Sequence, residues 1–319
     1  GRIHDHHGIK VDSNGEIFLF ADRGKNQVLI TDNKGNVQSV IGQKGRGPKE
    51  FLSIDGINFF TDSTIFVFDD DQKIATFFNI NGSIAHSFKY KNDDYFFTSP
   101  DYISKNSNIY TSILESEYVP FTRKNEFEKV VESKILIALD KEGRDLGKIG
   151  RYDSLTPFKN DYFVAQIVGS NPESDIIFIN QLTSPIIQYF NTKTNTFRVF
   201  SEQVPRNYFQ SAEAISSLSS RKKINELSIN RTFAERLVPL DKHLFKSMDK
   251  LTKEWNVTQD HLTKKSILVV YDYDGNIVAE KVLDGKRLFG GYGNSLFFLT
   301  DNNPDNFTIE VATYRLMNK

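Results

Sequence analysis

The feature that most constrains the fold is a unit of four short strands that recurs along the chain. Its clearest copy covers residues 7–42, where four alternating or apolar segments are separated by turns rich in Asn, Asp and Gly. The same order returns in residues 54–90. Turns of this composition favour tight hairpins, because Gly and Asn tolerate a positive φ. A meander repeated in this way predicts a propeller in which each unit is one blade.

The turn between the third and fourth strands helps to count the units, because a glycine stands there at Gly35, Gly82, Gly143 and Gly275. A less regular copy lies between the last two, and a final unit ends after three strands. We therefore expect an all-β fold, a six-bladed β-propeller of four-stranded antiparallel blades that forms a single domain over 1–319. The predicted blades are 8–42, 54–90, 97–150, 160–202, 230–283 and 288–317.

The sixth predicted blade lacks a fourth strand. Propellers protect their edge strands by closing the ring, so we expect the N-terminal segment before Gly8 to supply the missing strand. The alternative fold is a two-sheet sandwich of many short strands, which needs no repeating unit.

Composition narrows the classes of function. The 40 Lys and Arg residues nearly balance 41 Asp and Glu residues, so no global basic field favours nucleic acid or an anionic membrane. The absence of cysteine excludes disulfides, thiolate metal sites and cysteine nucleophiles within this sequence. Apolar runs are strand-sized, and we expect no transmembrane segment. The 27 phenylalanines suit sheets that are packed face to face.

The regular spacing breaks between 204 and 265. Part of this stretch has a helical pattern, and we expect a partly helical insertion around 204–230. Residues 203–265 hold 12 Lys and Arg against 7 Asp and Glu, so this insertion is basic while the rest of the chain is acidic. It could dock a partner, or it could be a solvated elaboration between blades.

Two passages carry a resemblance to a known family. Residues 8–18, together with 41–51 and its three glycines before Pro-x-x-Phe, resemble the NHL-type repeat. More narrowly, they are similar to the TolB-like six-bladed propellers of Bacteroidetes cell envelopes. The likeness is clearest over 8–90 and weaker over 134–150 and 266–283. It implies a periplasmic or cell-surface protein, lipoprotein anchoring through a cysteine upstream of this chain, and no established activity.

The loops between second and third strands provide candidate ligand-binding residues, because loops of several blades converge at the mouth of a propeller channel. In the first two blades they contain Asp22, Arg23, Asn26, Asp69, Asp70 and Lys73. Carboxylates from neighbouring loops could hold Ca²⁺ or bind a cationic or hydroxyl-rich ligand. Alternatively, the aspartates satisfy backbone donors in tight turns.

Motifs for catalysis are missing from the sequence. We find no G-x-S-x-G elbow, no Walker A loop and no H-E-x-x-H helix. His4, His6 and His7 cluster at the start of the chain, but such a terminal group without supporting partners does not predict a metal site. The metal-binding histidines of NHL-type lyases therefore do not carry over to this chain.

These observations favour a non-enzymatic envelope propeller, a monomer that binds a protein or glycan partner and needs no cofactor apart from a candidate Ca²⁺. The alternative is a hydrolase or lyase that acts on a saccharide or lactone through channel carboxylates, with or without a divalent cation.

Overall fold

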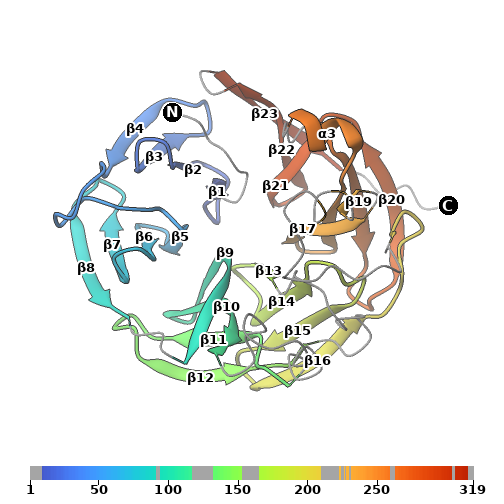
Figure 1. The fold of residues 1–319 in the computed structure, drawn as a ribbon, viewed down its shortest axis with the longest axis horizontal. Coiled ribbons are helices and arrows are strands. Elements are labelled where there is room, and N and C mark those ends of the chain that lie inside the picture. The colour runs from blue at the N-terminus through green and yellow to red at the C-terminus, as the bar shows by residue number, and fades with distance from the viewer. Residues whose placement is uncertain are drawn as a thin grey trace.

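The alternating segments and tight turns build antiparallel sheets that are arranged in a ring around one axis (Figure 1). In the described residues there are five four-stranded sheets and one three-stranded sheet, which confirms the predicted six-bladed β-propeller. The sandwich alternative is wrong. The computed structural model describes residues 9–90, 94–116, 132–152, 165–209, 223, 226, 228–229, 231–258, 263–303 and 306–314.

Each of the first three blades is a meander whose first strand lies nearest the axis (Figure 1). Blade one contains β1 (Ile9–Val11), β2 (Ile17–Asp22), β3 (Gln27–Asp32) and β4 (Val37–Ile41). Blade two contains β5 (Gly56–Thr61), β6 (Thr64–Asp69), β7 (Ile74–Asn79) and β8 (Ile84–Lys89). Blade three contains β9 (Tyr95–Lys105), β10 (Asn108–Glu115), β11 (Leu136–Leu139) and β12 (Asp145–Ile149).

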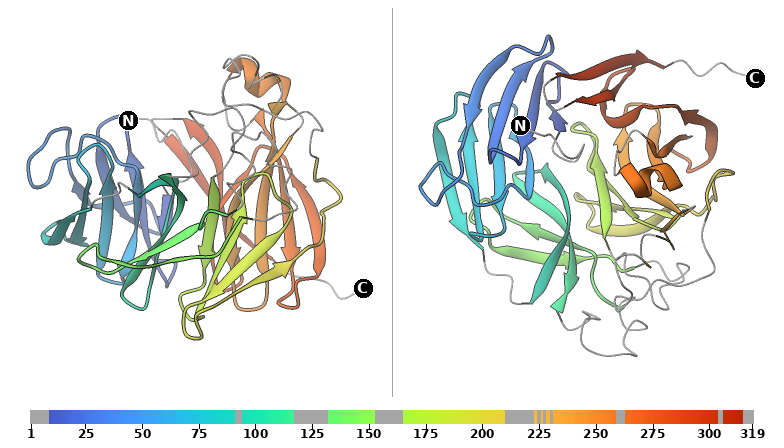
Figure 2. Two further views of the ribbon diagram at one scale, coloured as in Figure 1. Left: turned by 60° about the horizontal axis from the view of Figure 1, so that its bottom comes forward. Right: turned by 45° about the horizontal axis from the view of Figure 1, so that its top comes forward.

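The second half of the ring follows the same plan. Blade four contains β13 (Gln166–Ser170), β14 (Ile176–Gln181), β15 (Ile187–Asn191) and β16 (Thr196–Ser201). Blade five contains β17 (Thr232–Pro239), β18 (Leu244–Lys250), β19 (Lys265–Tyr271) and β20 (Ile277–Leu283). Blade six contains β21 (Arg287–Tyr292), β22 (Ser295–Asn303) and β23 (Asn306–Thr313). Helix α3 (Lys253–Thr258) lies in the β18–β19 connection and projects from one face of the ring (Figure 2).

Burial explains the strand sequences. The second strand of a blade is sandwiched between neighbouring sheets, so β2 and β6 read as nearly continuous apolar runs. The outermost strands β4 and β8 face solvent and are largely polar or exposed. The apolar core is therefore divided among the junctions between blades instead of lying at the centre of the ring.

The junction between the last and first blades shows how the ring is held together. Phe18 and Phe20 of blade one pack with Phe289 and Phe297 of blade six in one buried cluster. The rings of Phe18 and Phe297 meet edge to face with centroids 5.4 Å apart. This geometry is favourable for aromatic pairs, so hydrophobic packing contributes to closure. The predicted closing strand before Gly8 lies outside the described residues.

The stretch predicted to be irregular requires a correction. Residues 232–250 form the regular strands β17 and β18, and the expected break over 204–265 is wrong there. Charged residues within both strands interrupt the alternation of apolar and polar residues by which a strand is recognised in a sequence. The predicted helical insertion lies mostly outside the described residues; Lys223, Glu226 and Ser228 within it are helical, whereas 204–209 are not. Among the described segments, no helix combines the length and apolarity needed to cross a membrane.

Candidate functional site

The loops singled out from the sequence meet at one end of the ring. Arg23 and Asn26 of the β2–β3 loop line the same cavity as Asp70 of the β6–β7 loop. We call this end of the ring the mouth face. The β18–β19 connection, which carries α3, occupies the corresponding place in blade five.

Three of the six predicted residues mainly bind backbone groups. Asp22 accepts a hydrogen bond from the backbone N–H of Lys25 at 3.1 Å. The Asn26 amide donates to the carbonyl oxygens of Phe51 and Leu52 at 3.1 and 3.0 Å. These contacts fix the linker between blades one and two, as expected for polar residues of tight turns.

Asp69 has the same structural role in blade two. Its carboxylate accepts the backbone N–H groups of Leu52 at 2.7 Å and of Gln72 at 2.9 Å, and the residue is 2% exposed. Asp69 therefore supports the wall of the cavity without lining it.

The remaining three predicted residues lie at or beside the cavity, which Asn26 also lines. The Arg23 guanidinium donates to the carbonyl oxygens of Ile54 at 2.9 Å and of Asp55 at 3.4 Å. Asp70 accepts Lys73 Nζ at 2.7 Å in a half-exposed ion pair. Lys73 thus stands at the rim, bound to a residue of the lining.

The cavity has a volume of about 640 Å³ and lies between the first three blades. The linker before β5 contributes residues 52–55, and β9 contributes Phe97, Thr98, Ser99 and Tyr102. Its wall therefore combines aromatic rings with hydroxyl, amide and charged groups, a mixture that is usual in ligand sites.

Two carboxylates of the cavity keep one oxygen available. Asp55 Oδ2 accepts the Asp70 backbone N–H at 2.7 Å and the hydroxyl of Ser53. Asp70 Oδ1 accepts Lys73 Nζ and, at 2.9 Å, the hydroxyl of Tyr90. Within the described residues, Asp55 Oδ1 and Asp70 Oδ2 receive no hydrogen bond. Each acid is thus held by one oxygen and presents the other.

Buried tyrosines stabilise this arrangement. Burial raises the pKa of Tyr90 above its usual value, and the neighbouring Tyr102 and Asp70 raise it further. Tyr90 therefore keeps its proton and donates to Asp70. Burial likewise raises the pKa of Tyr102, whose ring stacks on Phe68 with centroids 4.2 Å apart.

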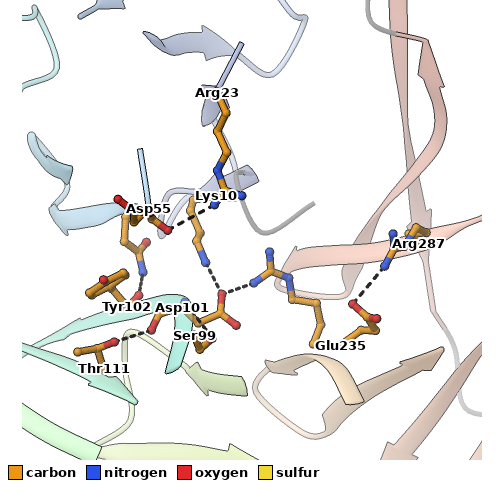
Figure 3. Close-up of polar contacts among 11 residues, drawn as sticks. Lys10, Arg23, Asp55, Ser99, Asp101, Tyr102, Thr111, Glu235 and Arg287 are labelled. Carbon is orange, nitrogen blue, oxygen red and sulfur yellow. Dashed lines mark hydrogen bonds and ion pairs between the residues drawn. The ribbon is translucent and has the colours of Figure 1, made fainter. Parts of the chain in front are cut away.

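A bulge in β9 gives the cavity its inner wall. Tyr102 pairs with Thr111 and Phe97 pairs with Ile113, so residues 98–101 of β9 lie opposite Ser112 alone. Extra residues in one strand bend it and re-aim their side chains. Within the bulge, Ser99 lines the cavity, and Asp101 points toward Lys10 of blade one (Figure 3).

Two residues beyond Ser99, three blades meet at one carboxylate oxygen of Asp101 (Figure 3). Asp101 Oδ1 of blade three lies 3.0 Å from Lys10 Nζ of blade one and 2.6 Å from Arg236 Nη1 of blade five. The exposed fractions of these side chains are 13% for Lys10, 2% for Asp101 and 5% for Arg236. We call this group the axial triad, and it crosses the axis of the ring.

A second ionic group links blades five and six. Arg287 Nη2 lies 3.1 Å from Glu235 (Figure 3) and 2.9 Å from Asp249. Lys264 Nζ lies 3.3 Å from Glu235. The β17–β18 register shifts between Ala234 and Arg236. This bulge allows the consecutive residues Glu235 and Arg236 both to form buried ion pairs.

The described residues contain no group of three His, Asp or Glu side chains arranged to hold a metal ion. The candidate Ca²⁺ site remains a prediction. His4, His6 and His7 lie outside the described residues.

Sequence reasoning missed Asp55, Ser99 and the axial triad. One signal was present, since Pro100 stands inside a strand and proline there often marks a bulge. The partners of Asp101 could not be found this way, because Lys10 and Arg236 come from blades far apart in sequence. Their meeting depends on the closed ring.

Comparisons with known proteins support the fold. The family DUF5128, described as a six-bladed β-propeller, matches residues 3–148. No curated protein matches this chain significantly.

Two solved structures from Bacteroides cover nearly the whole chain. A DUF4221 family member from Bacteroides vulgatus is 14% identical, with a TM-score of 0.70 over 95% of this chain and 92% of its own. A candidate exported protein from Bacteroides fragilis is 13% identical, with a TM-score of 0.54 over 93% of this chain and 79% of its own. The narrower NHL-type and TolB-like resemblance stays a prediction. At these identities the likeness establishes the fold, and this chain is a six-bladed β-propeller.

Proposed function

We propose that this protein is a non-enzymatic binding scaffold of the cell envelope that holds a glycan in the cavity of its mouth face. The observation that carries the proposal is the pair of carboxylates, Asp55 and Asp70, each of which presents one available oxygen to the same cavity. Sugar hydroxyls are donors that suit such oxygens, and hydrogen bonds to a charged acceptor are the stronger kind.

The volume and the lining of the cavity are consistent with a small polar ligand. Its volume of about 640 Å³ falls within the range of about 300–1,000 Å³ that is typical of ligand pockets. Phe97 supplies an apolar surface for a sugar ring, while Ser99 supplies a hydroxyl. Arg23, Asn26 and Asp70 of the lining come from loops of the mouth face, so the ligand would enter and leave through this face.

Rigid support favours binding by a preformed site. The two acids are fixed by Ser53, Lys73 and Tyr90, and the linker is fixed by Asn26 and Asp69. A preorganised site loses less conformational entropy when the ligand binds.

The proposed location outside the cytoplasm rests on likeness. One structural neighbour from Bacteroides fragilis is a candidate exported protein, and the sequence resembles envelope propellers. We propose a lipid anchor at a cysteine upstream of this chain. Fractionation of cells that produce the full-length protein, with a radiolabelled fatty acid, should place the labelled protein in the envelope; an unlabelled cytoplasmic protein would contradict this part of the proposal.

Saccharide binding can be tested with a panel of mono- and oligosaccharides by isothermal titration calorimetry. We expect at least one sugar to bind, and Asp55→Asn to weaken its binding because an amide accepts hydrogen bonds less strongly than a carboxylate. Asp71→Asn is the matched control, because Asp71 is exposed and absent from the lining.

Thermal unfolding should first show that both variants are folded. Equal saccharide affinity of the wild type and Asp55→Asn would show that the saccharide does not bind in this cavity, which contradicts the proposal. Conversion of a bound saccharide into products, followed by chromatography, would instead support the alternative of a saccharide hydrolase or lyase.

A further inference from the structure

The available polar atoms of the cavity are mostly acceptors. Besides Asp55 and Asp70, Asn26 of blade one lines the cavity, and its side-chain oxygen is an acceptor. We infer that the ligand carries a primary ammonium group, which donates to these acceptors; this inference rests on the proposed function and names the chemistry of its ligand.

Asn26 provides evidence that is independent of the acids. It is 7% exposed, and both of its amide hydrogen bonds go to the backbone carbonyls of Phe51 and Leu52. These two donations fix the amide orientation, so the oxygen must point away from the linker. No described residue donates to that oxygen. The Asn26 oxygen therefore remains accessible to a donor from outside the protein, such as a ligand ammonium.

The charges of the lining favour a cation. Asp55 and Asp70 are two negative groups, whereas Arg23 is the one positive group that lines the described cavity. The Arg23 guanidinium donates to the carbonyl oxygens of Ile54 and Asp55. An incoming ammonium group therefore meets a net negative lining.

The rim contains an internal example of the proposed contact. Lys73 Nζ binds Asp70 Oδ1 at 2.7 Å and lies 5.9 Å from the centre of the Tyr90 ring. A primary ammonium thus already occupies one side of this carboxylate, next to an aromatic ring. On the cavity side, Asp70 Oδ2 and Phe97 offer the same two kinds of group, a carboxylate oxygen and an aromatic ring that can attract a cation.

Ser99 indicates what surrounds the ammonium group. It lines the cavity, is 8% exposed, and accepts the backbone N–H of Asp101 at 3.1 Å. Its own hydroxyl proton has no acceptor among the described residues and can be donated to a ligand oxygen. A ligand that bears both an amine and hydroxyl groups, such as an amino sugar, can donate to the acceptors of the cavity and accept the hydroxyl proton of Ser99.

The inference can be tested with four probes by isothermal titration calorimetry at pH 7. D-glucosamine has the ammonium and the hydroxyls, D-glucose lacks the amine, N-acetylglucosamine has a neutral amide, and Nα-acetyl-lysine methylamide has the ammonium without the sugar. We expect glucosamine to bind about tenfold more tightly than glucose or N-acetylglucosamine, as for one charge-assisted hydrogen bond. Binding of the lysine derivative as tightly as glucosamine would support the ammonium and indicate a protein side chain as its source.

Variants of the lining test whether the preference for glucosamine over glucose arises in the cavity. Asp70→Asn should reduce the glucosamine-to-glucose ratio of affinities to less than about twofold, since the charge-assisted contact is lost. Asp71→Asn should leave the ratio unchanged. Because Asp70→Asn could disturb Lys73 and Tyr90, Asp55→Asn serves as a second variant with the same expectation.

The outcomes separate the inference from the proposed function. Equal affinity for glucose and glucosamine would overturn the inference that the ligand carries an ammonium group, while leaving glycan binding in place. Binding of the wider saccharide panel, but of none of these four probes, would also overturn it. If neither the panel nor the four probes bound the folded protein, the proposed function and the inference would fail together.

Discussion

At the junction of blades one and two, polar side chains bind backbone groups, whereas at the junction of blades five and six charged side chains bind one another. Asn26 and Asp69 hold the linker between the first two blades through its carbonyl and N–H groups. Glu235, Asp249 and Arg287 instead form buried ion pairs. A carboxylate or amide directed to the backbone can keep an oxygen available for a ligand, while mutually paired ions satisfy each other. The proposed binding cavity therefore lies where side chains hold the backbone, and ionic cross-links hold the junction of blades five and six.

The axial triad links these two regions, and its disruption should have the largest effect on stability. Asp101→Ala leaves the partly buried Lys10 and the buried Arg236 without their shared carboxylate. Breaking a buried ion pair from one side costs about 3–5 kcal/mol, and we expect a loss in that range in the free energy of unfolding measured with urea.

A triple variant tests whether the loss of stability in Asp101→Ala comes from unpaired charges or from altered packing. Lys10→Met, Asp101→Leu and Arg236→Met together remove all three charges, and apolar replacements of buried ion clusters are often tolerated. The triple variant should recover much of the lost stability. If it is as unstable as Asp101→Ala, the bulge of β9 rather than the ionic contact accounts for the loss.

Near the cavity, the backbone of blade two lies very close to a side chain of blade three. A Cβ atom at Gly56 would overlap the buried ring of Tyr102. We expect Gly56→Ala to lower the free energy of unfolding by about 1–3 kcal/mol, as for other overpacked cores. Because Tyr102 also lines the cavity, saccharide binding should weaken as well.

A double-mutant cycle checks this cause. Tyr102→Leu removes the ring that the new methyl group would strike, so the two substitutions together should cost less than the sum of their separate effects. Strict additivity would show that the two residues do not interact in this way.

Lys246 represents a third kind of junction, between blades four and five. Its ammonium is fully buried and donates to the carbonyl oxygens of Ser184 and Pro185, both at 3.2 Å. Burial lowers its pKa from 10.5 to about 7. Between these values the unfolded chain binds more protons than the folded protein, so this group makes stability rise with pH, by up to about 1.4 kcal/mol per pH unit.

Urea unfolding at pH 7, 8 and 9 tests this dependence. Lys246→Met should remove most of the rise seen in the wild type, because the titrating group is gone. Lys265→Met, which replaces an exposed lysine of the next strand, should retain it. The same slope in all three proteins would assign the pH dependence to other groups.

The regions also differ in how far sequence could predict them. In blades one and two the strands are apolar and the turns contain Gly, Asn and Asp, so both the meander and the loops of the mouth face could be anticipated. In blade five the partly buried Glu235 and the buried Arg236 interrupt the apolar pattern, and their partners Arg287 and Asp101 are supplied by other blades. Periodicity detects burial against apolar neighbours and carries no information on ion pairs formed across the ring.

The smallest expected change in stability concerns Lys73, at the rim of the cavity. Its pair with Asp70 is 44% exposed on both sides, and such surface pairs contribute about 0.2–1 kcal/mol. Lys73→Ala should therefore change the free energy of unfolding by less than about 1 kcal/mol. Removal of the competing ammonium leaves both oxygens of Asp70 more negative, so glucosamine should bind a few times more tightly, as isothermal titration calorimetry would measure. Lys25→Ala is the control from the corresponding loop of blade one, because Lys25 is exposed and absent from the lining. Weaker glucosamine binding by Lys73→Ala would show that Lys73 itself contacts the ligand, and the junction of blades one and two would then contribute a donor as well as acceptors.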